Sequence, residues 1–197
     1  MDVEQKIKHQ QAIATEIFGI AAAHGIHDII LAGGAPRDWH FGRPASDLDF
    51  YMGKITTDFR EEVYKHCRSI DYMYSQGDGN DTTLNLGVSI EGDYNCNEHI
   101  VEITEADYKG QVIQLIEHTD MPCVLTDFVY SICQVKWTPS TGIITTPVFD
   151  LSAKHSIIVK TGTGYANYRK YAAKIRKKFP AFKFVNKKDA FDYWLKG

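Results

Sequence analysis

Two aspartates spaced two residues apart are the side chains of this sequence best suited to chemistry. Asp47 and Asp49 belong to the segment DLDFYM, in which apolar residues alternate with them. Because successive side chains of a β-strand point to opposite faces, both carboxylates project from one face. Carboxylate oxygens suit Mg²⁺ or Mn²⁺, and bound phosphates complete the coordination of such ions. The pair predicts that Asp47 and Asp49 bind a divalent cation, and that this cation acts on a phosphate-bearing substrate.

A glycine pair and an arginine precede the two aspartates. The apolar run HDIILA ends at Gly33 and Gly34, and a short helix is expected to follow. Backbone N–H groups at the start of a helix attract anions, and Arg37 adds a positively charged fork nearby. We therefore expect Gly33, Gly34 and Arg37 to bind a triphosphate. Asp38 is interpreted as structural, as a partner for Arg37 or a cap for the turn.

Together these residues resemble the signature of the DNA polymerase β-like nucleotidyltransferase superfamily. The likeness is to the head domain of the CCA-adding enzyme and bacterial poly(A) polymerase family, and residues 33–38 (GGAPRD) and 47–49 (DLD) carry it. Residues 126–132 (TDFVYSI) resemble the segment that closes that head domain. Residues 168–184 resemble the first helix of its neck. The similarity covers about residues 25–184.

The resemblance implies an α+β nucleotidyltransferase fold, with a mixed, mostly antiparallel sheet flanked by helices. It implies a catalytic domain at residues 1–160 and a basic, helical, neck-like extension at 161–197 packed on it. The implied reaction is metal-dependent transfer of an NMP from an NTP to a hydroxyl acceptor with release of pyrophosphate. The favoured acceptor is an RNA or tRNA 3′ end. Two alternatives stay open: transfer to a small molecule or protein hydroxyl, and a relative that binds nucleotide or RNA without turnover.

The sequence departs from the family in its neck. The family uses a Glu-Asp-x-x-Arg element to pair with the base of the incoming CTP or ATP, whereas residues 165–169 here read YANYR. Arg169 alone matches, and we expect it to contact the nucleotide. The preference for a base is therefore not transferable. The chain also stops where the family continues into helical domains that hold the tRNA, so ordinary CCA addition is not expected.

A third carboxylate from a later strand is common in the superfamily. The best-placed segment is QVIQLIEH, residues 111–118, in which Gln114 is expected to point toward the aspartate pair. The acids available as a third ligand are Glu117 and Glu102.

The net charge of −3 hides two oppositely charged parts. Residues 154–197 carry 12 Lys and Arg against two Asp, for a charge of +10; residues 1–153 carry 10 Lys and Arg against 23 Asp and Glu, for −13. Basic clusters act within a Debye length of about 10 Å, so the total does not exclude a polyanionic partner. We expect the basic C-terminal region to line the acceptor or triphosphate side of the nucleotide cleft.

The composition, 44% apolar and 24% charged, is that of a globular protein. No apolar run reaches the roughly 18–20 residues of a membrane span, which predicts a soluble protein with no membrane partner. The cysteines lack C-x-x-C spacing and no signal peptide is visible, which predicts reduced thiols and a cytoplasmic location.

Helices are expected at 4–24 and 58–67 and strands at 70–75, 84–90, 99–104 and 111–117, whereas 124–137 fits a strand or a buried helix.

Overall fold

The computed structural model describes residues 1–75, 98–162 and 168–195, and the expected strand at 84–90 lies outside them. The helices are α1 (Val3–Ala23), α2 (Gly34–His40), α3 (Thr57–Tyr64), α4 (Val124–Asp127), α5 (Pro147–His155), α6 (Tyr168–Lys178) and α7 (Lys187–Leu195). The strands are β1 (Ile30–Ala32), β2 (Asp47–Met52), β3 (Cys67–Ser75), β4 (Ile100–Tyr108), β5 (Gln111–His118), β6 (Val135–Thr138), β7 (Gly142–Thr145), β8 (Ile157–Val159) and β9 (Lys183–Val185). Single 3₁₀ turns occupy Met121–Cys123 and Ser131–Cys133.

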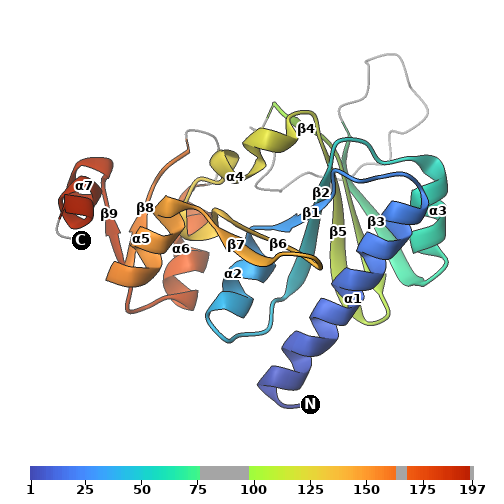
Figure 1. Ribbon diagram of the computed structural model, residues 1–197, viewed down its shortest axis with the longest axis horizontal. Coiled ribbons are helices and arrows are strands. Elements are labelled where there is room, and N and C mark those ends of the chain that lie inside the picture. Colours follow the sequence, from blue (N-terminus) through green and yellow to red (C-terminus); the bar gives the residue numbers. More distant parts are fainter. Residues whose placement is uncertain (76–97, 163–167, 196–197) are drawn as a thin grey trace.

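Within the described residues, seven strands form one sheet in the order β3-β4-β5-β2-β1-β6-β7 (Figure 1). The pairing of β2 with β5 is parallel, and the other neighbours are antiparallel. The expected mixed, mostly antiparallel α+β architecture is confirmed. β2 lies at the centre of the sheet, so its backbone is hydrogen-bonded on both sides and its side chains are fixed in direction.

Two apolar clusters cover the two faces of the sheet. On one face Leu48 and Phe50 of β2 are fully buried with Ile17 of α1 and Phe59 of α3. Helix α1 begins with a capping box in which the Asp2 side chain accepts from the Gln5 N–H, so its start is well defined. Figure 1 shows α1 lying across this face. The cluster therefore anchors the central strand from the side opposite the aspartates.

The second cluster draws the C-terminal segment onto the other face. Ala172 and Ile175 of α6, and Phe179 just after it, are buried with Tyr51 of β2 and with Phe128, which follows α4. Strand β8 pairs in parallel with β9 across the expected boundary at residue 160. The division into 1–160 and 161–197 stays a prediction, but the two parts share a strand pair and an apolar core.

The turn between β4 and β5 is shorter than the sequence analysis expected. The strands expected at 99–104 and 111–117 leave residues 105–110 as the connection, but β4 continues to Tyr108 and the reversal takes only Lys109 and Gly110, with φ of 53° and 88°. Such left-handed backbone is typical of tight hairpins. Glu105 consequently belongs to a strand. The open segment 124–137 resolves into α4, a 3₁₀ turn and the start of β6.

The described cysteines Cys67, Cys123 and Cys133 carry free thiols, and Cys96 lies outside the described residues. None of the helices in the described ranges is long and apolar enough to cross a membrane.

A buried histidine joins β5 to the segment that follows it. His118 is fully buried; its Nδ1 accepts from the Asp120 N–H (3.2 Å), so Nε2 carries the proton that faces Asp127 Oδ2 (3.2 Å). Burial lowers the pKa of His118 below its ordinary 6.5, against the opposing effect of Asp127, and the neighbouring His99 lowers it further. The folded protein therefore favours the neutral form of the His118 imidazole.

Acid should destabilise the protein through His118. Below about pH 6.5 the unfolded chain binds a proton that the folded His118 resists, so the free energy of unfolding falls as pH falls. Urea unfolding at pH 7.5 and 5.5 measures this loss. His118→Asn, which keeps an acceptor near the Asp120 N–H, should lose less stability over that interval than the wild type. An equal loss in both proteins would show that His118 does not contribute.

Candidate active site

The two aspartates lie on one face of β2, as the alternation predicts. Leu48 and Phe50 point into the cluster beneath α1, and Asp47 and Asp49 face α6 instead. In register with them on β5 are Val112 and Gln114. The carboxylates thus sit side by side on a strand that packing has already immobilised.

The glycine turn between β1 and α2 lies directly beside these carboxylates. Gly33 has φ 78°, and a Cβ placed on it would lie 2.8 Å from Phe128 Cζ. A Cβ on Gly34 would lie 3.9 Å from Arg37 Nη2, from Asp47 Oδ1 and from Asp49 Oδ2. Gly33 is therefore required by both backbone and packing. The missing side chain of Gly34 leaves open space among one guanidinium and two carboxylates.

Arg37 is buried and held in a fixed orientation. Its Nε donates to Asp38 Oδ1 (2.9 Å), and its Nη1 donates to Cys133 Sγ (3.2 Å). The other oxygen of Asp38 accepts from Lys178 Nζ, and the Tyr171 hydroxyl contacts Cys133 Sγ (3.2 Å). Asp38 pairs with Arg37 as expected. The network ties α2 to α6 and leaves Nη2 of Arg37 on the side of Gly34.

The basic helix α6 lies along the cleft that contains the aspartates. Lys174 and Lys178 contribute positive charge there, and Tyr171 and Ile175 supply apolar surface. Two lysines of the basic C-terminal region therefore line this cleft, and the expectation that they face the acceptor or the triphosphate stays a prediction. The other lining residues are Gly34, Arg37, Ser46, Asp47, Asp49, Tyr51 and Phe128.

The electrostatics of Asp49 suit a bound cation. Its Oδ1 is buried and has no hydrogen-bond partner in the described structure. Burial, and then the carboxylate of Asp47, raise the pKa of Asp49 well above its ordinary range, whereas Lys174 and Arg37 lower it. A divalent ion would give the buried oxygen a partner and offset the repulsion between the two carboxylates.

The residues present fit Mg²⁺ or Mn²⁺ bound together with a phosphate substrate. Among the described residues, no group of three or more His, Cys, Asp or Glu side chains is arranged to hold a metal. Mg²⁺ is commonly bound through one or two carboxylates while substrate phosphates and water complete its octahedron. Asp47 and Asp49 are the side chains that would hold it.

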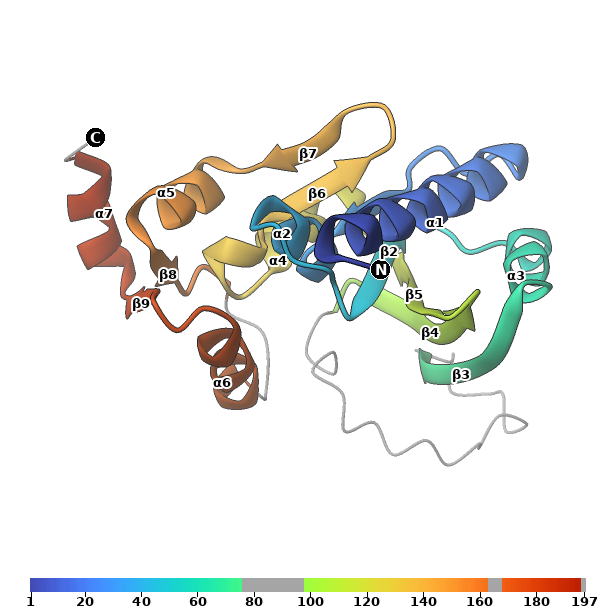
Figure 2. The same cartoon turned by 90° about the horizontal axis from the view of Figure 1, so that it is seen from below.

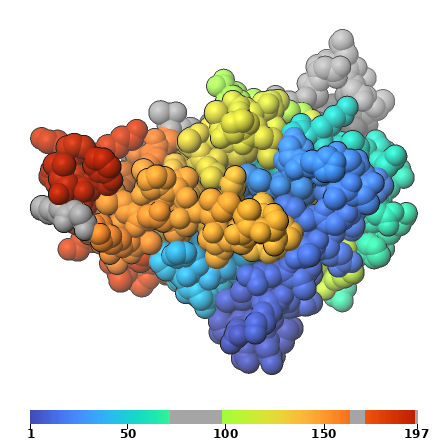
Figure 3. All heavy atoms as spheres, viewed as in Figure 1, coloured from blue at the N-terminus to red at the C-terminus, as the bar shows by residue number. Residues whose placement is uncertain are grey.

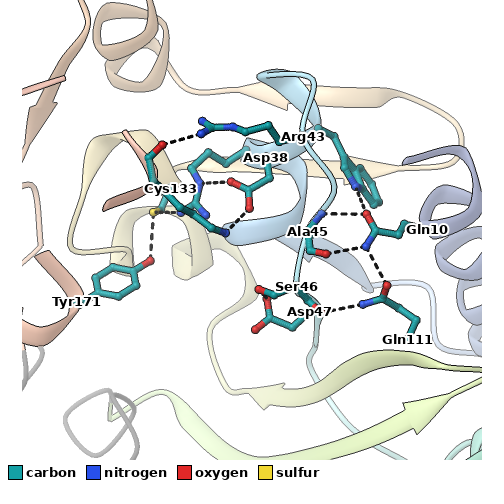
Figure 4. Close-up of polar contacts among 12 residues, drawn as sticks. Gln10, Asp38, Arg43, Ala45, Ser46, Asp47, Gln111, Cys133 and Tyr171 are labelled. Atoms are coloured by element: carbon teal, nitrogen blue, oxygen red, sulfur yellow. Dashed lines mark hydrogen bonds and ion pairs between the residues drawn. The ribbon is translucent and has the colours of Figure 1, made fainter. Parts of the chain in front are cut away.

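A buried amide holds the segment that leads into Asp47. Gln10 Oε1 accepts from Trp39 Nε1 and from the Ala45 N–H (3.0 Å each), and its Nε2 donates to Ala45 O and Gln111 Oε1 (2.8 Å each). Gln111 in turn donates to Ser46 O (3.0 Å). Figure 4 shows these contacts converging on the segment just before Asp47. Sequence reasoning missed Gln10, because a glutamine in an amphipathic helix gives no signal of its partner.

Comparison with known proteins gives no match at the level of sequence. No family model matches the chain, and no curated protein matches it. Solved structures do match. The Thermotoga maritima CCA-adding enzyme complexed with tRNA aligns over 96% of this chain with a TM-score of 0.62 at 12% identity. The Bacillus stearothermophilus CCA-adding enzyme in complex with CTP aligns over 87% with a TM-score of 0.52 at 16% identity.

The chain has the nucleotidyltransferase fold. A tRNA-processing enzyme in its apo form also aligns, over 89% of this chain, with a TM-score of 0.58 at 14% identity. The resemblance inferred from residues 33–38 and 47–49 is thus confirmed at the level of fold. The chain spans about 40% of the length of these structures, 43%, 40% and 43% in the order named.

Neither glutamate expected as a third acid reaches the aspartate pair of this nucleotidyltransferase fold. Glu117 lies in register with Met52, on the opposite face of the sheet from Asp49, and accepts from the Ile55 N–H (2.8 Å). Glu102 is paired with Arg60 (2.7 Å). The period of two in β5 places Glu117 and Gln114 on opposite faces, which is why the expectation is wrong.

The acid brought nearest in register is Glu105 of β4. Glu105 pairs with Gln114, which pairs with Asp49 on β2. Gln114 Nε2 donates to Glu105 Oε2 (2.8 Å), and the charge of Glu105 contributes to the raised pKa of Asp49. The alternation in ITEADY was the signal for this strand. The strand expected at 99–104 ends one residue before Glu105.

Arg169, expected to contact the nucleotide, belongs to the first turn of α6. Its side chain lies outside the described part of the chain, so its role stays a prediction.

Alanine at the two glycines should have opposite consequences. Gly33→Ala should lower the free energy of unfolding by about 1–3 kcal/mol, because it forces left-handed backbone and a clash with Phe128. Gly34→Ala meets only ordinary contacts and should unfold like the wild type, yet its methyl group fills the space between Arg37 and the carboxylates. Calorimetric titration with an NTP and Mn²⁺ should show weaker binding. Unchanged binding by Gly34→Ala would contradict the assigned cradle.

Gln10→Leu tests whether the buried amide positions Asp47. We expect the affinity for Mn²⁺ to fall about tenfold, as on loss of outer-shell support. Gln134→Leu is the matched control, since Gln134 is 5% exposed against 4% for Gln10 and is also hydrogen-bonded, to Thr161. It should lose stability without that loss of affinity. Equal Mn²⁺ affinities in the two variants would assign Gln10 a role in stability alone.

Proposed function

We propose that this chain transfers a nucleoside monophosphate from an NTP to a hydroxyl acceptor and releases pyrophosphate. The favoured acceptor is the 3′ end of an RNA. The observation that carries the proposal is the pair Asp47 and Asp49, with a buried and unpartnered carboxylate oxygen, in a cleft lined by a basic helix. The solved structures with this fold include proteins named as complexes with CTP, with tRNA, and with a primer tRNA and an ATP analogue.

The reaction breaks one phosphoanhydride bond and forms one phosphate ester bond. The acceptor oxygen forms a bond to the α-phosphorus, and the bond from that phosphorus to the oxygen that bridges to the β-phosphate breaks. Pyrophosphate carries the electron pair away, and the hydroxyl proton passes to solvent water. Asp47 and Asp49 would hold a Mg²⁺ or Mn²⁺ ion. That ion would lower the pKa of the acceptor hydroxyl and neutralise negative charge on the phosphates.

The remaining lining residues orient the substrates. The open space beside Gly34 admits a phosphate within reach of Arg37, whose Nε and Nη1 contacts fix its orientation. Lys174 faces Asp49 from α6 and offsets the charge of the triphosphate from the opposite wall. Tyr51 and Phe128, packed with ring centroids 5.9 Å apart, form an apolar wall that limits access of water. We keep Arg169 as a contact to the nucleotide.

Transfer should depend on the aspartate pair. With α-labelled NTPs, Mg²⁺ or Mn²⁺ and a pool of small RNAs, the wild type should label RNA. Asp47→Asn with Asp49→Asn should reduce the rate by about a thousandfold or more, the scale expected for groups that act in the transition state. Asp58→Asn, an exposed acid on α3, is the control and should retain activity.

Retained activity in the double variant would refute the assigned site. Label in a small molecule or a protein band would move the acceptor to that class. Nucleotide binding without labelled product from any acceptor would show that the protein binds nucleotide without turnover.

A further inference from the structure

Helix α7 leaves two aromatic rings in solvent at one end of the molecule. The side chains of Phe191 and Trp194 are 55% and 64% exposed, and Leu195 beside them is 66% exposed. The ring centroids of Phe191 and Trp194 lie 6.2 Å apart with an interplanar angle of 33°. Figures 1 and 3 show α7, coloured red, at the end of the molecule opposite α3. The two rings therefore present neighbouring flat surfaces that no described residue covers.

The helix is held in place by its other face. Ala190 is buried with Ile157 and Val159 of β8, and Tyr193 packs against the same cluster. At its start, the Asn186 side chain accepts from the Asp189 N–H (2.8 Å) and donates to the Asp189 carboxylate (2.9 Å). The exposed rings are thus carried on an anchored helix.

Positive charge flanks the exposed rings. Lys187 and Lys188 lie four and three residues before Phe191, the two spacings that place side chains next to one another on a helix. Both lysines are exposed, as is Lys183 of β9 just before α7. Asp189 and Asp192 of α7 are exposed as well, and Asp189 is hydrogen-bonded to Asn186 (2.9 Å), so the three lysines exceed the two acids of this surface by one charge. The surface is suited to a partner that offers flat apolar rings together with negative charge.

The apolar part of this surface is small. Among the described residues, the other large apolar side chains with substantial exposure lie at the start of α1 and on β3, β5 and β7, away from α7. A stable protein interface buries about 800 Å² on each partner, which three side chains do not supply. Two aromatic faces flanked by lysines instead match the way single-stranded nucleic acids are held, with bases stacked on rings and phosphates near cations.

We propose that α7 is a stacking platform for single-stranded RNA. Bases stack on Trp194 and Phe191, and the adjoining phosphates lie near Lys187 and Lys188. Helix α6, which lines the cleft, is followed through β9 by α7 at the same end of the molecule (Figure 2). The assignment of RNA as the acceptor rests on the proposed function, and the platform holds the acceptor upstream of the end that reacts.

The exposed tryptophan reports on the platform directly. Trp39 and Trp137 are 5% and 7% exposed, so quenching of tryptophan emission by a stacked base comes from Trp194. The full chain is titrated with a labelled 12-residue oligoadenylate, and anisotropy and tryptophan emission are both recorded. We expect saturable binding with quenching. Trp194→Ala should weaken binding by about tenfold and abolish the quenching, whereas Trp194→Phe should restore most of the affinity.

The lysines and a matched surface variant complete the test. Lys187→Ala with Lys188→Ala should reduce the slope of log K against log salt by about two. Ile144→Ala, which truncates an exposed apolar side chain on β7, should bind as the wild type does. Equal affinities of wild type and Trp194→Ala would overturn the platform. Self-association that depends on Trp194 without RNA binding would assign the surface to a second copy of the chain.

The platform and the proposed function fail separately. A wild-type protein that binds the oligoadenylate but transfers no nucleotide to any acceptor would overturn the proposed function alone. Transfer to a non-RNA acceptor without oligoadenylate binding would overturn the platform alone.

Discussion

Two like charges held side by side on a central strand impose the main constraint on this structure. Asp47 and Asp49 cannot move apart, because Leu48 and Phe50 between and beside them are fully buried on the other face of the sheet. Burial and mutual repulsion raise the pKa of Asp49 well above its ordinary range. Positive charge must therefore be brought to this strand from elsewhere in the chain. The position of α6 and the fixed orientation of Arg37 both meet that need.

The connection between α2 and α6 shows how distant segments are combined. Asp38 binds Arg37 on one oxygen and Lys178, which lies 140 residues away in the sequence, on the other. Removing either cation would leave a buried carboxylate short of a partner, and such losses are costly. The C-terminal segment is thus part of the cleft wall. Its excess of positive charge has a local purpose that the net charge of −3 conceals.

The likeness to the CCA-adding enzymes is a likeness of fold. At 12–16% identity the fold is similar, because many apolar sequences satisfy the same pattern of burial. The glycine turn and the aspartate pair expected from the sequence lie together in one cleft, and their roles stay a prediction. The third acid expected from the sequence was wrong, since Glu117 and Glu102 lie across the sheet from Asp49 and Glu105 takes the nearer position. The residue types along β4 and β5 do not reveal which of them lie beside Asp49, because that depends on the register between the strands.

The sequence by itself determined the features that depend on neighbouring residues. The alternation around Asp47 and Asp49 specified their common face, and Gly33 with Gly34 marked the turn beside them. Tertiary structure alone decided that β5 lies parallel to β2, that Glu105 sits in a strand, and that Gln10 holds the segment before Asp47. Periodicity is a property of consecutive residues. Strand partners and buried hydrogen bonds between residues 35 or more positions apart are settled by packing of the whole chain.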